Sequence, residues 1–314
     1  MKRPRSTLLG ALTVITALVL AACGSQTTGN ATPAATTGTE ATAAPQPTTA
    51  AAPTAAEQAT SAPNGGATAD PATTLRWSLE GISDLTSIDP AKPGDAPTIT
   101  VINNVFGGLV RLDDKLQVQP DGASEWKVSD DGKTYTFTLR DGLKFADGTP
   151  VTAGDFAYSI NRALSPDTAS YGAPFQLGHI LGAQDVVDGK ATEASGIKAV
   201  DDKTLEITLD QPIAYFLAQL TYPYTFVVPK SLVESGADWE TRAYGTGPYK
   251  VQEWKRGQSV LLTANENYWA GTPGIPNILH VFNKDSETAF QLYQTGELDI
   301  MGSQQNPIPS AHVA

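Results

Sequence analysis

The chain has 314 residues, of which 33 are acidic and 21 basic, with a formal net charge of −12 and a single cysteine. The acidic balance argues against nucleic acid or an anionic membrane surface as a partner. The lone cysteine excludes an internal disulfide, so the fold must rest on its hydrophobic core.

Residues 1–22 have the layout of a secretory signal peptide. Three basic residues precede an uncharged run from Leu8 to Leu20, which is shorter than the roughly 20 apolar residues of a transmembrane helix. The tetrapeptide Leu20-Ala21-Ala22-Cys23 resembles the lipobox of bacterial lipoproteins. The resemblance implies that the Cys23 thiol carries a lipid and becomes the new N-terminus. We therefore expect a bacterial protein anchored on the outer face of the cytoplasmic membrane or in the periplasm; a secreted protein with a stray cysteine is the alternative.

Residues 23–74 follow as a segment of different composition. Ala, Thr, Pro, Gly and Gln dominate it, and it contains no aromatic residue. Such a segment buries too little apolar surface to offset the entropy of ordering. We predict a disordered tether after the lipidated cysteine, with the globular part beginning near Leu75.

The first part of the globular region predicts a strand, a helix and a hairpin. A short strand is expected at 77–79 and a helix from 97 to 106, which Gly107-Gly108 ends. Residues 125–128 and 135–139 flank a Ser-Asp-Asp-Gly turn, and in the second segment apolar residues alternate with threonines. This alternation is typical of a half-buried antiparallel strand.

The second part mixes helices and strands without strict alternation. Helices are expected at 152–164, where Thr152 and Asp155 have capping-box spacing, and also at 213–220 and 286–295. A strand at 205–209 follows Asp201-Asp202-Lys203, which lacks the spacing of a calcium loop and is interpreted as a turn. The order of elements favours a mixed α/β (α+β) fold.

The search for catalytic and cofactor motifs yields no candidate. His179, His280 and His312 do not have metal-ligand spacing, and no Gly-x-Ser-x-Gly elbow occurs. The segment Gly245-Thr246-Gly247-Pro248 lacks the lysine of a phosphate-binding loop. We therefore predict no enzyme activity, metal or cofactor.

The stretch from Ser129 to Phe156, SDDGKTYTFTLRDGLKFADGTPVTAGDF, resembles the signature region of the family 5 extracellular solute-binding proteins. These are the peptide-binding lipoproteins of ABC importers. Residues 167–171 and 178–180 are similar to the oligopeptide-binding branch. Further matches follow in family order at 87–90, 106–109, 199–205, 245–249, 267–269 and 296–299.

The resemblance implies a periplasmic-binding-protein-like fold of type II. Residues 75–270 would form the first lobe with its inserted subdomain, and residues 271–314 would begin a second lobe. Family members are usually much longer than this chain, so the second lobe would be mostly missing and the chain truncated. The family's acidic anchor for the α-ammonium of a peptide is expected in that missing lobe.

The resemblance also implies a set of ligand-binding residues. They are Glu80 and Gly81 after the first strand, Tyr171, and Gly245 with Thr246 near a hinge. Each has a structural alternative: Glu80 as a solvated charge, Tyr171 as a core aromatic and Gly245 as a turn glycine.

The function implied by the resemblance is a lipid-anchored receptor that captures oligopeptides and delivers them to the permease and ATPase of an ABC importer. Two alternatives remain open from the sequence. The same scaffold could bind a sugar, a nickel complex or a signalling peptide, and a lipoprotein hydrolase is a more remote alternative.

Overall fold

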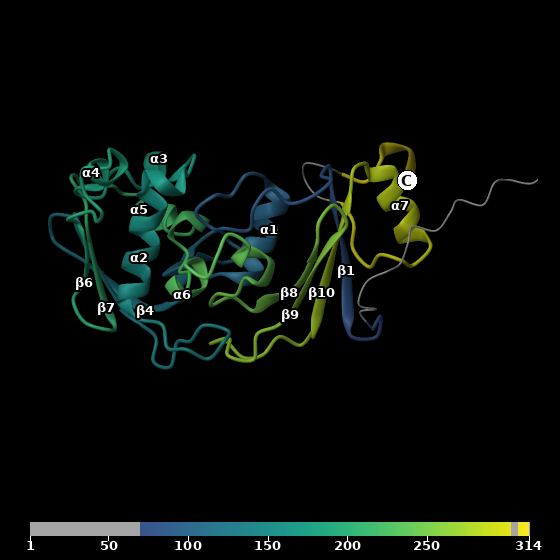
Figure 1. The fold of residues 1–314 in the computed structure, drawn as a ribbon, viewed down its shortest axis with the longest axis horizontal. Helices are drawn as coiled ribbons and strands as arrows, with labels where there is room; N and C mark the ends of the chain where they lie inside the picture. The colour runs from purple at the N-terminus through teal and green to yellow at the C-terminus, as the bar shows by residue number, and fades with distance from the viewer. Residues whose placement is uncertain (1–69, 303–306, 314) are drawn as a thin grey trace, which may run out of the picture. The chain divides into compact units, whose positions relative to one another are not determined.

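The computed structural model describes residues 70–302 and 307–313, which contain two four-stranded β-sheets, a two-stranded hairpin and the helices around them (Figure 1). The predicted signal peptide, Cys23 and nearly all of the predicted tether lie outside these residues. Within the described ranges, no helix has the length and apolar character that a membrane crossing requires.

The first sheet joins the beginning and the end of the described chain. Its strands lie in the order β1 (Thr74–Glu80), β10 (Asn277–Asn283), β9 (Ser259–Ala264) and β8 (Tyr249–Lys255). β1 and β10 are parallel, and the other pairs are antiparallel. The strand expected at 77–79 is confirmed within the longer β1.

β10 lies beyond the predicted boundary between the lobes. A second lobe is predicted from residue 271, but β10 lies between β1 and β9 in the first sheet. The first sheet therefore includes residues up to Asn283. Sequence periodicity alone does not reveal which strands pair. The lobe boundary at residue 271 stays a prediction.

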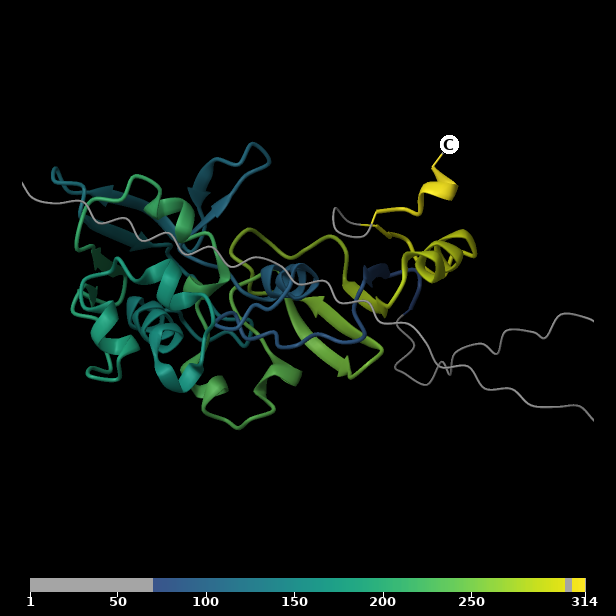
Figure 2. The same cartoon turned by 90° about the horizontal axis from the view of Figure 1, so that it is seen from above.

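The chain after β10 returns to β1. The predicted helix at 286–295 is confirmed as α7 (Ser286–Gln294), where the Asp285 side chain accepts a hydrogen bond from the Thr288 N–H. Ile300 then forms a parallel bridge with Trp77. Figure 2 shows α7 and the segment that follows it beside β1.

The second sheet is antiparallel throughout. Its strands lie in the order β4 (Ala123–Val128), β5 (Thr134–Leu139), β7 (Thr204–Thr208) and β6 (Ile197–Ala199). The predicted hairpin is confirmed as β4 and β5, and the alternating apolar side chains of β5 are buried while its threonines are half-buried. Helix α2 (Ala153–Leu164) packs on this sheet.

Local signals in the second sheet behave as the sequence predicts. The capping box is present, because Thr152 Oγ1 accepts from the Asp155 N–H and Asp155 accepts from the Thr152 N–H. The Asp201 carboxylate accepts from the backbone N–H groups of Lys203 and Thr204, so it stabilises the β6–β7 turn.

Short elements connect the two sheets. Helix α1 (Ala96–Val105) packs against β8, and the hairpin β2 (Val110–Leu112) and β3 (Val118–Pro120) follows it. The helix predicted at 213–220 is a single turn, α5 (Phe216–Gln219), since Pro223 begins another short element just beyond it. The remaining elements are η1 (Pro166–Thr168), α3 (Ala173–Leu177), α4 (Ala183–Val187), η2 (Pro223–Thr225), α6 (Lys230–Val233), η3 (Trp239–Arg242) and η4 (Ser310–His312).

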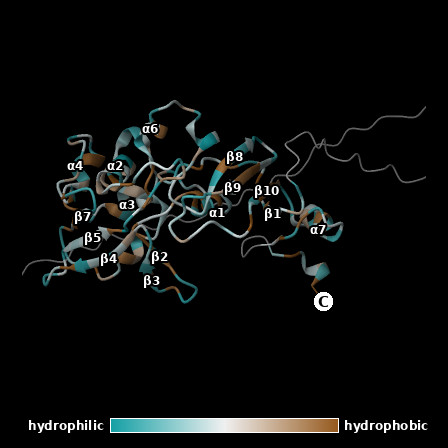
Figure 3. Cartoon of the chain, turned by 90° about the horizontal axis from the view of Figure 1, so that it is seen from below, coloured by the Kyte–Doolittle hydropathy of each residue, from teal (hydrophilic) through white to brown (hydrophobic). Residues whose placement is uncertain are grey.

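Two apolar clusters form the core. One packs α2 against the second sheet and includes Phe137 and Phe156; the other packs α1 against the first sheet and includes Ile102 and Val260. Figure 3 shows hydrophobic residues along α2 and β9, which belong to these clusters.

Candidate functional site

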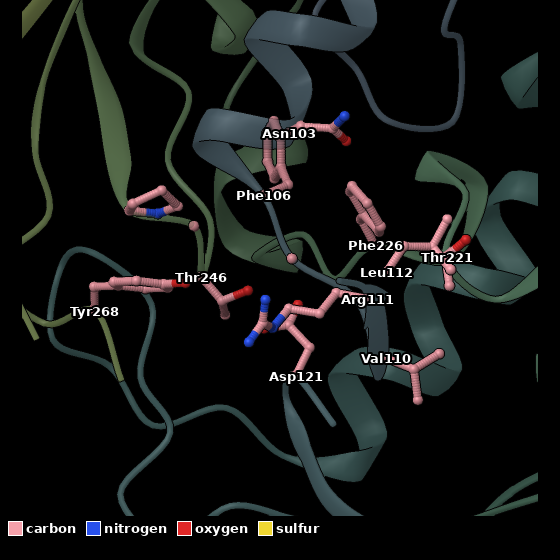
Figure 4. Close-up of a pocket in the computed structure, with 13 residues that line it drawn as sticks. Asn103, Phe106, Val110, Arg111, Leu112, Asp121, Thr221, Phe226, Thr246 and Tyr268 are labelled. Carbon is pink, nitrogen blue, oxygen red and sulfur yellow. The ribbon is translucent and has the colours of Figure 1, made fainter. Parts of the chain in front are cut away.

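A cavity of about 330 Å³ lies where the end of α1 meets β2 and the segment before β8. Its apolar wall includes the rings of Phe106 and Phe226, and its polar lining includes Arg111, Asp121 and Thr246 (Figure 4). Such a volume is at the lower end of the range for small-molecule sites.

Two glycines allow the segment that contains Gly245 and Thr246 to pack closely against the end of α1. A Cβ on Gly245 would lie 2.5 Å from Phe106 Cδ1 and 2.7 Å from the Val105 carbonyl oxygen, so only glycine fits. The Gly247 N–H donates to the Val105 carbonyl at 3.0 Å. This close backbone approach holds Thr246 in the cavity wall.

Thr246 presents a hydroxyl group to the cavity. Its residue is only 4% exposed, yet its hydroxyl forms no hydrogen bond with any described residue. A hydroxyl group in a cavity wall can donate to or accept from water or a ligand.

Asp121 is the buried carboxylate of the cavity, with 8% of the residue exposed. The Trp269 indole Nε1–H donates to its Oδ1 at 3.0 Å. The Arg140 guanidinium stacks on the Trp269 ring, 3.8 Å from the ring centroid, and also donates to the Asp121 backbone carbonyl. Burial raises the pKa of Asp121, and the indole hydrogen bond and nearby arginines lower it by less.

Tyr268 adds an aromatic side chain to the same wall. Burial is the main cause that raises the pKa of its phenol, and the charge of Asp121 raises it further. The ring therefore stays neutral at physiological pH and offers a hydroxyl group that can donate or accept.

The other predicted site residues do not line this cavity. Glu80 is buried at the end of β1, where its carboxylate accepts from the Gly302 N–H at 3.0 Å, and the adjacent Gly81 has a φ of +80°. Tyr171 is fully exposed. The alternatives of a solvated Glu80 and a core Tyr171 are therefore wrong, while the ligand-binding role of all five residues stays a prediction.

The sequence analysis did not identify Arg111 and Asp121 as residues that line a cavity. Asp121 precedes a glycine and looks like a turn residue, and its hydrogen-bond partner Trp269 is distant in sequence. Tyr268 and Gly107 were within segments that carried the family resemblance, which was the one signal pointing to them. In residues 70–302 and 307–313, no three His, Cys, Asp or Glu side chains form a metal-binding group.

Comparison with known proteins gives a consistent result. Residues 117–312 match the family model described as "Bacterial extracellular solute-binding proteins, family 5 Middle". The periplasmic oligopeptide-binding protein OppA of Salmonella typhimurium is 37% identical over 245 residues, which cover 76% of this chain and 44% of the relative. The periplasmic murein peptide-binding protein MppA of Escherichia coli is 40% identical, over 69% of this chain and 41% of the relative.

Solved structures show the same partial coverage. The structure of Haemophilus influenzae OppA in complex with RPPGFSPFR superposes with a TM-score of 0.68 at 29% identity, over 73% of this chain and 46% of that one. The predicted fold class, a mixed α/β arrangement of the type II periplasmic-binding-protein kind, is confirmed. The chain spans less than half the length of the curated relatives described above.

Proposed function

Because the chain belongs to the family 5 bacterial extracellular solute-binding proteins, we propose that it contains the first lobe of a receptor that captures oligopeptides for an ABC importer. The observation that carries the proposal is the cavity beside α1, whose lining combines aromatic rings with buried polar groups. Such a lining suits a ligand with amide groups and varied side chains.

The relatives support peptide as the ligand class. Two are named for binding oligopeptides and murein peptides, and a solved relative is in complex with the peptide RPPGFSPFR. The relatives are named as binding proteins, which supports a role without catalysis. Capture by closure of two lobes around an extended ligand is a known mode of such receptors.

The share of the relatives' length that this chain covers bears on affinity. One lobe supplies one wall of a cleft, so a peptide on it remains largely hydrated and few of its hydrogen bonds are shielded. The loss of translational and rotational freedom, about 4 kcal/mol or more, is then mostly uncompensated. We expect this chain to bind oligopeptides no more tightly than millimolar, which corresponds to roughly 4 kcal/mol.

The cellular setting is also part of the proposal. A lipid on Cys23 would hold the receptor on the outer face of the membrane or in the periplasm, where it would meet the permease and ATPase of the importer. The relatives named above are described as periplasmic, which supports an extracytoplasmic location.

Titration calorimetry of the chain with a library of tripeptides to pentapeptides tests the proposal. We expect saturable heats in the millimolar range, with no comparable heat for maltose or nickel ions. Saturation by a sugar or nickel without any peptide response would contradict the ligand class. Micromolar peptide binding would show that one lobe suffices.

A further inference from the structure

Two side-chain oxygens lie close to the same glycine in the cavity beside α1. A Cβ on Gly107 would lie 2.9 Å from Thr246 Oγ1 and 3.1 Å from Asp121 Oδ2. Figure 4 shows the side chains of Thr246 and Asp121 on the same side of the cavity. Both oxygens therefore lie close to the Gly107 backbone, where a larger residue would crowd them.

The Asp121 carboxylate is buried, with its Oδ2 close to Gly107 in the cavity wall. Burial raises the pKa of its carboxyl more than the Trp269 hydrogen bond and the nearby arginines lower it. An ammonium group in the cavity would supply the missing positive charge, and the unpartnered Thr246 hydroxyl would accept a second hydrogen bond from it.

Arg111 provides a positive group at the exposed side of the same cavity. It forms no ion pair with any described residue within 4.0 Å, and its side chain extends toward Thr246 and Asp121 (Figure 4). A guanidinium binds a carboxylate through two parallel hydrogen bonds. The cavity thus offers sites for a positive and a negative group a short distance apart.

We propose that this cavity binds an α-amino-acid head group, with the ammonium on Asp121 and Thr246 and the carboxylate on Arg111. The head group can come from a free amino acid or from a peptide that carries one on a side chain or through a γ-linkage. The aromatic rings of Phe106, Phe226 and Tyr268 surround the remaining carbon atoms. An apolar ligand would bring no positive group to the Asp121 carboxylate, and a simple anion would be repelled by it. This assignment rests on the proposed binding function of the lobe.

The Trp269 indole N–H is a built-in reporter, because it donates to the carboxylate that holds the ammonium. NMR titrations of the ¹⁵N-labelled chain with L-alanine, ethylamine and propionate compare the whole head group with its two halves. We expect saturable shifts of the Trp269 indole resonance with L-alanine, weaker shifts with ethylamine and none with propionate. Equal binding of ethylamine and L-alanine, or tighter binding of propionate, would overturn the assignment.

Charge-neutralising variants test the two anchors. Asp121→Asn keeps an oxygen for the Trp269 hydrogen bond, and Arg111→Gln removes the carboxylate anchor. Each should weaken L-alanine binding about tenfold or more, the effect of losing one charge-assisted hydrogen bond. Gly107→Ala should weaken it as well, because the added methyl group would crowd both oxygens.

Matched controls lie in the β2–β3 hairpin. Asp114→Asn and Lys115→Gln make the same charge changes at exposed positions that do not line the cavity. They should leave L-alanine binding unchanged. If they weaken it as much as the cavity variants do, the effect comes from net charge and the assignment fails.

Binding of two isomeric dipeptides shows whether the cavity recognises a head group that is part of a peptide. The same comparison tests this inference independently of the proposed function. γ-Glutamylalanine carries ammonium and free carboxylate on one carbon, whereas α-glutamylalanine carries the same charges on different carbons. We expect the γ-isomer to bind more tightly and Asp121→Asn to remove the difference. Peptide binding that ignores both the isomer and Asp121 would overturn the assignment while the receptor function stands. Binding of L-alanine without any peptide binding would support the assignment and refute the peptide receptor.

Discussion

His280 is a buried histidine without a polar partner. It lies in the middle of β10, fully buried, and neither ring nitrogen has a hydrogen-bond partner among the described residues. Its ring packs near Trp77, with the centroids 5.3 Å apart. Burial lowers the pKa of His280 to about 4. The folded protein therefore holds this ring neutral well below the ordinary pKa of histidine.

This arrangement predicts acid sensitivity. Above about pH 6.5 the ring is neutral in both states and contributes no pH dependence. As the pH falls from about 6.5 to 4, His280 is protonated in the unfolded chain but stays neutral in the folded chain. The free energy of unfolding therefore falls, by roughly 2–3 kcal/mol at pH 4.5. Urea unfolding at pH 7 and pH 4.5 measures the loss.

The variant His280→Leu should remove this part of the pH dependence and also raise stability at pH 7, because an unpaired buried polar ring is replaced by an apolar side chain. His179→Gln, at a partly exposed position, serves as the control. An unchanged difference between the two pH values in His280→Leu would show that other groups cause the acid sensitivity.

The ion pair of Asp89 and Arg162 predicts a second effect at single residues. Both guanidinium NH groups donate to the carboxylate, at 2.9 and 2.5 Å, and the Asp89 side chain is 1% exposed. Asp89→Asn should lower the free energy of unfolding by about 3 kcal/mol, since it leaves the partly buried Arg162 without its counter-charge. Chemical denaturation measures this loss.

The matched control for that change is the exposed pair of Lys190 and Asp188. Asp188→Asn should cost much less, because solvent screens that pair. The double variant Asp89→Leu with Arg162→Met should recover much of the stability that Asp89→Asn loses. A double variant as unstable as Asp89→Asn would mean that packing, not charge, sets the cost.

The segment after α7 protects the edge of β1. The backbone N–H groups of Asp299 and Ile300 donate to the Arg76 carbonyl, and the Ser78 N–H donates to the Ile300 carbonyl. The Asp299 carboxylate also binds the Arg76 guanidinium. Without this segment, β1 would present unpaired backbone groups that can pair with another molecule.

Deleting residues 297–314 should therefore increase aggregation on heating, as measured by light scattering. Deleting residues 307–314 removes part of the same tail and keeps the hydrogen bonds to β1, so it is the control. Equal aggregation of the two truncated chains would show that pairing along β1 does not limit solubility.

Elements with local signals were predictable from sequence. The alternation in β5, the capping box of α2 and the Asp201 turn each depend on residues close together in the chain. The place of β10 was not predictable, because its parallel partner β1 is roughly 200 residues away and no local pattern encodes that register. The cavity illustrates the same limit, since Asp121 and Thr246 meet only through the packing of α1 on distant segments.

For the whole molecule, the signal at the N-terminus predicts membrane attachment. Cys23→Ser should leave the protein either uncleaved or released from membranes, because the lipid acceptor is lost. Membrane fractionation after a high-salt wash measures this. A Cys23→Ser protein that is processed normally and still sediments with membranes would contradict the lipoprotein prediction.

The predicted tether gives a second test at this scale. Its composition predicts that limited proteolysis first cuts within residues 23–74 and leaves a core that begins near Leu75. Mass spectrometry of the early fragments locates the cut. Early cleavage within α2, with residues 23–74 intact, would contradict the predicted boundary.

The parallel pairing of β1 with β10 also sets an order of events during synthesis. β1 is made first, but its neighbour in the sheet is made roughly 200 residues later, a delay of roughly 10 to 40 seconds at about 5–20 residues per second. The second sheet and α2 lie between β1 and β10 in the sequence, so they can fold before β10 is available to pair with β1. Among the strands of residues 70–302, β1 therefore depends longest on whatever keeps an emerging chain from aggregating.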